Sequence, residues 1–278
     1  MLIKCWGSRG SIPVSGVSYV KYGGDTTCVE IRPENGRVII IDAGTGIRNL
    51  GNALREEGCR SVDIFFTHAH WDHIIGFPYF SPIYTANFNI RIHCRTYGLD
   101  MQKILEYQMM PPMFPVNLNQ VKASIEYIHN GPGGFEIEGI QVQTIPLSHP
   151  NQGSGFRFTE NGKSFTFITD NELGHVHQGG LAFDAYRDFC SGSDLLMHDA
   201  EFTEAEYERY RTWGHSSYTK ALELAIVADV KRFGLFHFNQ ERTDEQVDQM
   251  VGDCKKKTGR NGPGPECFGV NCGFTIKL

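Results

Sequence analysis

The apolar positions of this chain fall into short runs separated by polar and glycine-containing stretches. Seven of these runs have the length and the aliphatic or aromatic content of buried strands. They lie at residues 38–41, 62–66, 90–92, 140–145, 164–169, 195–197 and 233–236. Seven strands are many for a single sheet, so the pattern predicts a strand-rich core.

Helical periodicity is clearest from Tyr218 to Ala228, behind a serine, Ser216 or Ser217, that can cap the helix. A second helix is expected to include residues 100–107. Helices and strands are mixed throughout, so the predicted class is α/β (α+β). The Gly/Pro-rich stretches at 130–134 and 259–265 are typical of loops rather than of domain linkers. We therefore expect one domain over residues 1–278.

Composition narrows the class of protein. The 278 residues are 40% hydrophobic, enough to bury a full core. No apolar stretch approaches the roughly 18 residues that span a bilayer, and the start of the chain has no hydrophobic signal core. The expectation is a soluble, cytoplasmic protein without membrane contact. Eight scattered cysteines without a Cys-x-x-Cys pair favour reduced thiols, and a net charge of −6 argues against a broad nucleic-acid-binding surface.

The densest chemistry lies in seven consecutive residues, Thr67-His68-Ala69-His70-Trp71-Asp72-His73, directly after the apolar run at 62–66. Neutral imidazoles and carboxylates are preferred ligands of zinc and similar divalent ions. The alternation of His68 and His70 lets both rings converge on one ion, and Asp72 and His73 remain for a second. A chance run of such residues on a polar loop is the alternative, but a buried strand feeding into the cluster argues against it.

Other polar residues follow predicted strands at corresponding positions. His149 comes after the strand ending at 145, Asp170 after that ending at 169, Asp199 after that ending at 197, and His237 after that ending at 236. A residue at the end of a strand is held more rigidly than one within a long loop. We expect these side chains to gather with the histidine segment at one edge of the sheet structure.

This order of residues, His68-x-His70-x-Asp72-His73, then His149, Asp170 and His237, resembles the metallo-β-lactamase fold superfamily of hydrolases over nearly the whole chain. The resemblance implies a four-layer αββα sandwich with two divalent metal ions at one edge. One ion would be bound by His68, His70 and His149, the other by Asp72, His73 and His237, with Asp170 bridging them. Asp42, in the loop Asp42-Ala43-Gly44-Thr45-Gly46, would steady the histidine segment.

A second region resembles the tRNA 3′-processing endonuclease (RNase Z) branch of that superfamily. It comprises residues 196–202, Trp213-Gly214-His215-Ser216-Ser217 and residues 230–238. The resemblance implies that Asp199 and His215 form a pair that assists loss of the leaving oxygen. The opening segment, residues 7–13, is also similar to that branch, although on its own it is typical of a hairpin turn. The branch's long tRNA-gripping arm has no counterpart here, which brings the chain closer to the smaller phosphodiesterases.

The expected activity is that of a dinuclear metal-dependent phosphodiesterase acting on cyclic nucleotides or other small phosphodiesters. Two ions about 3.5–4 Å apart can share a water and lower its pKa, so that a metal-bound hydroxide is the expected nucleophile. The catalytic residues would be Asp72, Asp199 and His215. Zinc is the first expectation for the metal, with manganese or iron as alternatives.

Several alternatives stay open at this point. Asp170 stands where a true zinc β-lactamase supplies cysteine, which disfavours antibiotic hydrolysis. A tRNA 3′-processing endonuclease, a thioester or lactone hydrolase of the same fold, and a metal-dependent nucleic-acid-binding or sensing module remain. Nucleic acid is thus a possible but not a favoured partner, and a homodimer is an expectation that comes from the resemblance alone.

Overall fold

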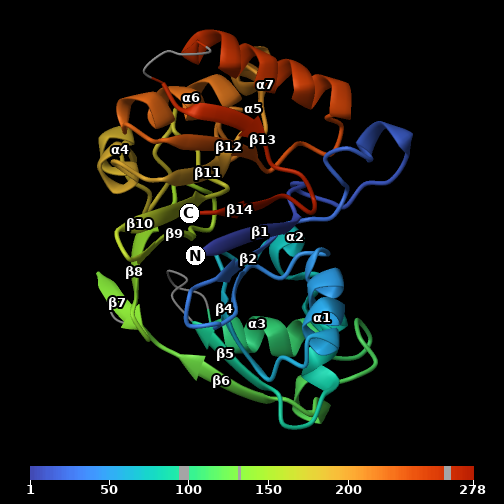
Figure 1. Ribbon diagram of the computed structural model, residues 1–278. Helices are drawn as coiled ribbons and strands as arrows, with labels where there is room; N and C mark the ends of the chain where they lie inside the picture. The colour runs from blue at the N-terminus through green and yellow to red at the C-terminus, as the bar shows by residue number, and fades with distance from the viewer. Residues whose placement is uncertain (94–99, 131–132, 260–263) are drawn as a thin grey trace.

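The computed structural model of the protein describes residues 1–93, 100–130, 133–259 and 264–278 (Figure 1). Cys94 and parts of the predicted loops at 130–134 and 259–265 lie outside these ranges. Within them, the strands form two seven-stranded sheets. Since each predicted apolar run became a strand and helices are interspersed, the expected α/β class is confirmed.

The first sheet has the order β14-β1-β2-β3-β4-β5-β6. Its strands are β1 (Leu2–Gly7), β2 (Cys28–Arg32), β3 (Ile39–Ile41), β4 (Ser61–Phe65), β5 (Asn89–His93), β6 (Ser124–Ile128) and β14 (Thr275–Lys277). The strands β3 to β6 run parallel, whereas β14, β1, β2 and β3 pair antiparallel. The last strand of the chain thus pairs with the first.

The second sheet has the order β13-β12-β11-β10-β9-β8-β7. Its strands are β7 (Gly134–Ile137), β8 (Ile140–Pro146), β9 (Ser154–Glu160), β10 (Lys163–Ile168), β11 (Leu195–Asp199), β12 (Arg232–Phe236) and β13 (Glu266–Gly269). Strands β10 to β13 are parallel, and β7 to β10 form an antiparallel meander. Each sheet therefore carries a parallel half.

Helices cover the outer faces of both sheets, as Figure 1 shows. On the first sheet lie α1 (Ile47–Glu56) and α3 (Met101–Gln108), and the short α2 (Trp71–Ile74) follows β4. On the second lie α4 (Phe183–Cys190), α5 (Glu204–Tyr210), α6 (Tyr218–Val227) and α7 (Asp244–Thr258). The 3₁₀ turns are Val17–Tyr19, Phe77–Tyr79, Ser81–Tyr84 and Leu118–Gln120. Within the described part of the chain, no helix is long and apolar enough to cross a membrane.

Three buried clusters fill the spaces between these layers, because successive side chains of a strand point to opposite faces. Ile39 and Ile41 of β3 contribute to the cluster between the sheets, whereas Ile40 packs under the helices of the first sheet. Leu195 and Leu196 of β11 divide in the same way. Strands buried on both faces are continuously apolar, which is the pattern seen in the sequence. The result is the four-layer αββα sandwich.

The two predicted helices are present. The cap of α6 is Ser217, whose side chain accepts a hydrogen bond from the backbone N–H of Lys220. Asp100 caps α3 in the same way, through the N–H of Lys103. The cysteines of the described residues are free thiols, as expected. In the last turn of α7, Lys255, Lys256 and Lys257 are exposed.

Candidate metal centre

Two clusters of imidazole and carboxylate groups share a single aspartate, Asp170. Within each cluster, one donor atom from every residue lies within 4.8 Å of the others. The first cluster contains His68, His70, His149 and Asp170, and the second contains Asp72, His73, Asp170 and His237. The residues that the sequence assigned to two metal ions are therefore close together in the folded chain.

The two oxygens of Asp170 face different clusters. Oδ2 lies 3.5 Å from Nε2 of His68 and 3.8 Å from Nε2 of His149. Oδ1 lies 3.2 Å from Nε2 of His73 and 3.2 Å from Nε2 of His237. The carboxylate lies between the two groups of imidazoles, which is the position that a bridging ligand requires.

Strand ends place these side chains. Strands β4, β10 and β12 are parallel members of their sheets, and ligands commonly bind beyond the carboxyl ends of such strands. Directly or within two residues after a strand end, Asp42, Asp170 and His237 have φ angles of 61°, 52° and 59°. Non-glycine residues rarely adopt this left-handed conformation, and it recurs at functional sites. It turns the backbone sharply at the edge where the clusters meet.

Asp42 and Thr67 fix the imidazoles of the histidine segment. Oδ2 of Asp42 lies 2.8 Å from Nδ1 of His73, and Thr67 donates to both Asp42 oxygens from its N–H and its hydroxyl, each at 2.7 Å. Nδ1 of His68 lies 3.1 Å from the Thr67 hydroxyl oxygen. With Nδ1 engaged, Nε2 of each ring points to the clusters. The predicted contact between Asp42 and the histidine segment is present.

Two further rings are oriented in the same manner from the second sheet. Nδ1 of His149 donates to the backbone carbonyl of Gly214 at 2.8 Å, and Nδ1 of His237 lies 3.2 Å from Oε2 of Glu201. His70 differs, because its Nδ1 faces Nε2 of His149 at 3.1 Å. Such outer contacts select which ring nitrogen is free to bind an ion.

The buried nitrogen atoms and the donor types of the two clusters are suited to divalent cations. Nε2 of His68 and Nε2 of His73 are buried and form no hydrogen bond of acceptable geometry with any described residue, although Asp170 oxygens lie 3.5 Å and 3.2 Å away. A buried polar atom without a hydrogen bond is costly, and a cation between the imidazoles and Asp170 would satisfy both atoms. A mixed nitrogen and oxygen donor set suits zinc, manganese or iron.

The protonation of the site is set by burial and by opposite charges. Burial lowers the pKa of His68 well below its usual value and that of His149 to about 3, so both rings are neutral at pH 7. Burial alone raises the pKa of Asp170, but His237, His73 and His68 hold it well below its usual range. Neutral imidazoles and ionised carboxylates are the forms that bind metals, so His68, His149 and Asp170 are already in the binding form.

Burial alone lowers the pKa of His73 and of His237, but nearby carboxylates raise both well above the usual value. Asp72 and Asp170 raise the pKa of His73, and Asp170, Asp72 and Glu201 raise that of His237. Both rings would release a proton when a cation binds.

Asp199 and His215 form the predicted pair beside the second cluster. Oδ2 of Asp199, the last residue of β11, lies 2.7 Å from Nδ1 of His215, so the short aspartate side chain reaches the ring. The His215 ring stacks on His237 with centroids 5.0 Å apart. Burial alone lowers the pKa of His215, but Glu201 and Asp199 raise it to about 9. The imidazole is therefore protonated at neutral pH.

Three residues at the site were not identified from the sequence. Glu201 contacts both His215 and His237 through Oε2, at 3.2 Å each. It lies two residues after Asp199, a spacing that could have signalled a shared side. The backbone N–H of Ser11 donates to Oδ2 of Asp72 at 2.8 Å, and a Cβ on Gly10 would lie 2.4 Å from the His237 ring. The opening segment is thus a loop against the clusters rather than the hairpin turn that was its alternative interpretation.

Comparisons with known proteins agree with this arrangement. A family model described as "Beta-lactamase superfamily domain" matches residues 37–238. A Ribonuclease Z from Azobacteroides pseudotrichonymphae genomovar. CFP2 is 26% identical over 241 residues, covering 76% of this chain and 81% of that protein.

Solved structures share the fold at lower identity. The metallo-β-lactamase fold protein YhfI from Bacillus subtilis is similar with a TM-score of 0.72 and 14% identity, over 99% of this chain and 98% of that one. A diphosphatase from the PhnP family is similar with a TM-score of 0.69 and 16% identity, over 100% of this chain and 97% of that one. Since the family model spans most of the chain, the protein belongs to the β-lactamase superfamily, as a metallo-β-lactamase-fold hydrolase of the RNase Z-like branch.

Proposed function

We propose that this hydrolase cleaves phosphodiesters with two divalent cations in its site. One cation would be held by His68, His70 and His149, the other by Asp72, His73 and His237, and both by Asp170. The buried Nε2 atoms of His68 and His73, which form no hydrogen bond of acceptable geometry with any described residue, support this assignment. Zinc fits the donor set best, and manganese or iron would also fit.

When bound, such a pair of cations activates water at neutral pH and stabilises the negative charge of a phosphodiester in its transition state. The chain's own residues provide the rest. Asp72 would take part in catalysis from a fixed position. Its Oδ2 lies 3.1 Å from Nε2 of His237 and accepts a hydrogen bond from the Ser11 N–H, so two separate segments of the chain hold it.

The observation that carries the proposal is the Asp199–His215 pair at 2.7 Å, next to the second cluster. With Nδ1 of His215 engaged by Asp199, Nε2 is the nitrogen left to give a proton to a departing oxygen. Asp199 orients the ring and stabilises its charged form. A phosphodiester needs this assistance, because its leaving oxygen gains negative charge as the bond to phosphorus breaks.

The comparisons favour bonds to phosphorus without fixing the substrate. One relative is named a ribonuclease and one structural neighbour a diphosphatase. Here β6 ends at Ile128 and β7 begins at Gly134, so their connection is too short for an RNA-gripping arm. Together with the net charge of −6, this favours cyclic nucleotides or other small diesters over long RNA. A homodimer stays a prediction.

The proposal is tested with bis(4-nitrophenyl) phosphate and zinc-loaded protein. Turnover should vanish with a chelator and return with zinc. His215→Ala should lower kcat by roughly a hundredfold or more while the zinc content stays unchanged. His129→Ala, at an exposed histidine, is the matched control and should leave turnover intact. Failure to cleave any diester, together with turnover of thioesters or lactones that survives His215→Ala, would show that the protein is one of the alternative hydrolases.

A further inference from the structure

A cavity of about 470 Å³ opens beside the histidine segment. Ala69 and Trp71 belong to its wall, and they alternate along the chain with His68, His70 and Asp72. Because consecutive Cα atoms are about 3.8 Å apart, the backbone of the wall is continuous with that of the metal centre. Two residues of the cavity wall are therefore direct chain neighbours of the proposed metal ligands.

The lining of this cavity is apolar and rich in aromatic rings. None of the described residues that line it carries a charge, and the side chains that give it its character are Trp71, Tyr79, Tyr107, Met113 and Phe114. Several of these are open to solvent, since Trp71 is 74% exposed, Tyr79 60% and Met113 51%. An exposed group of large apolar side chains next to a reactive centre is typical of a ligand-binding surface.

The walls of the cavity are held in place by their own contacts. The Gln108 side-chain amide of α3 donates to the backbone carbonyl of Ile74 in α2 at 2.9 Å, which ties the two helices together. The rings of Tyr79 and Phe114 meet edge to face with centroids 5.6 Å apart. The surface is thus shaped before a ligand arrives, and its binding would not require these segments to order.

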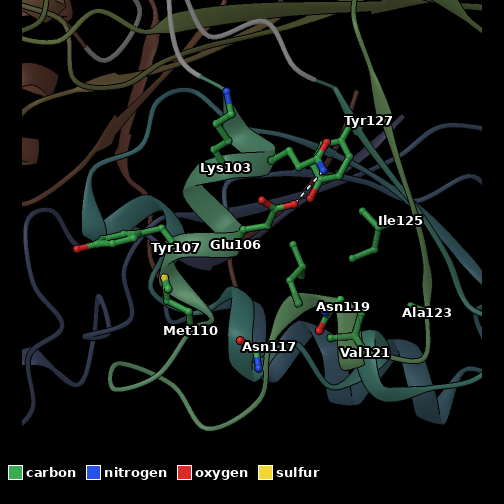
Figure 2. A pocket seen from close by; sticks show the side chains of 12 residues that line it. Lys103, Glu106, Tyr107, Met110, Asn117, Asn119, Val121, Ala123, Ile125 and Tyr127 are labelled. Carbon is green, nitrogen blue, oxygen red and sulfur yellow. Dashed lines mark hydrogen bonds between the residues drawn. The ribbon is translucent and has the colours of Figure 1, made fainter.

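A larger hollow of about 660 Å³ is lined in part by Lys103 and Glu106 of α3 (Figure 2). Tyr107 lines both spaces. This hollow mixes charged and amide side chains, such as Lys103, Glu106 and Asn119, with the apolar residues of β6 and its approach. None of its lining residues belongs to the histidine segment, which distinguishes this hollow from the 470 Å³ cavity.

From these observations we propose that the 470 Å³ cavity binds an uncharged aromatic substituent of the phosphodiester substrate. The inference rests on the proposed function and specifies its substrate class: a small diester that carries an aryl group or a nucleobase. Planar rings stack on Trp71, Tyr79 and Tyr107, whereas a chain of further phosphates would find no cation in this cavity. Trp71 and Tyr79 are then specificity-determining residues.

The test compares two diesters with the same leaving group, methyl 4-nitrophenyl phosphate and phenyl 4-nitrophenyl phosphate, on the zinc-loaded protein. Phenylphosphonate and methylphosphonate, which are not cleaved, are titrated in parallel by calorimetry and by tryptophan fluorescence. Burial of one aromatic ring should favour each phenyl compound by roughly tenfold to a hundredfold. Trp71→Ala and, from the other wall, Tyr79→Ala should bring both preferences close to one. Ile226→Ala, which changes an exposed side chain of α6, should preserve both preferences.

Equal use of the two diesters, or a preference that survives both alanine variants, would overturn the assignment while leaving phosphodiester cleavage intact. A loss of self-association in Trp71→Ala with an unchanged preference would also overturn it, because the cavity would then be covered by a second copy of the chain. If neither diester is cleaved, the proposed function fails, and the two phosphonates still decide whether the cavity prefers an aromatic ring.

Discussion

A single carboxylate oxygen, Oε2 of Glu201, lies 3.2 Å from Nδ1 of His237 and 3.2 Å from Nδ1 of His215. The other oxygen accepts a hydrogen bond from the side-chain amide of Asn239 at 2.9 Å. Glu201 therefore connects a proposed metal ligand with the proposed proton donor. Residues of this kind orient imidazoles and increase their basicity toward a metal.

Replacing this carboxylate by an amide should weaken metal binding. In Glu201→Gln the charge is lost, and one amide N–H₂ must face an imidazole N–H or turn away from it. We expect zinc affinity to fall by roughly tenfold to a hundredfold, as measured by competition with a chromogenic chelator. Glu241→Gln removes an exposed carboxylate nearby and should have no effect. Equal zinc affinity in the wild-type protein and Glu201→Gln would show that Glu201 does not support His237.

The sequence identifies the side chains that would bind a metal better than it identifies the groups that hold those side chains in place. The histidines and aspartates could be found because they cluster after apolar strands. The carbonyl of Gly214 and the N–H of Ser11, which contact His149 and Asp72, are backbone groups that every residue carries. Whether such a backbone group contacts a metal ligand depends on the path of its loop, and the type of residue does not indicate it.

Among the elements, the segment from α5 to α6 delivers His215 and is anchored by the buried Glu172. The Glu172 carboxylate accepts hydrogen bonds from the Tyr207 hydroxyl at 2.9 Å and from the N–H groups of Thr212 at 2.8 Å and Gly214 at 2.9 Å. The His177 ring contacts it at 2.8 Å. One side chain thus fixes the loop on which the proposed proton donor lies.

The pH dependence of stability follows from these contacts. Burial alone raises the pKa of Glu172, but the N–H of Thr212, the His177 ring, the N–H of Gly214 and the Tyr207 hydroxyl lower it below the ordinary value of 4.5. A depressed carboxyl pKa contributes stability above the unfolded pKa, and this contribution is lost as the pH falls through the folded value. Glu172→Gln should therefore be less stable than the wild type by about 1–3 kcal/mol at pH 7. The difference should shrink below pH 4.5 in urea titrations, and a difference that grows on acidification would contradict this role.

Gly214 occupies a position that no larger residue fits. Its φ is +93°, and a Cβ there would lie 2.1 Å from Nδ1 of His149. Gly162, in the turn between β9 and β10, has a φ of +74° and open space around it. Gly162→Ala should cost about 1 kcal/mol of stability from backbone strain alone. Gly214→Ala should cost more and should also weaken zinc binding, since the overlap displaces a ligand. Equal losses in both variants, with zinc affinity intact, would show that the contact with His149 is unimportant.

Helix α7 and strands β6 and β7 were not predicted from the sequence, for physical reasons that the structure shows. Helix α7 carries apolar residues at Val247, Met250, Val251 and Cys254, and its cap at Thr243 pairs with Gln246. These apolar residues are interspersed with polar ones, so the segment has no continuous apolar run like those of the central strands. Strands β6 and β7 lie at sheet edges and are only partly buried, so their sequences lack the continuous apolar pattern of central strands.

For the whole molecule, the site lies where the two sheets meet. His68, His70, Asp72 and His73 follow β4 of the first sheet, whereas His149, Asp170 and His237 follow strands of the second. Bound cations would connect the two sheets, and Asp170 would connect the cations. We infer that residues 1–278 act as one domain, because β14 returns to pair with β1 and the clusters need both sheets.

The most direct measurement is the zinc content per chain after loading and removal of free metal, by plasma mass spectrometry. The wild-type protein should retain two ions. His149→Ala and His237→Ala, each in a different cluster, should each retain about one, and Asp170→Ala should lose affinity at both positions. Fewer than two ions in the wild type, or two ions retained in all three variants, would contradict a dinuclear centre bridged by Asp170.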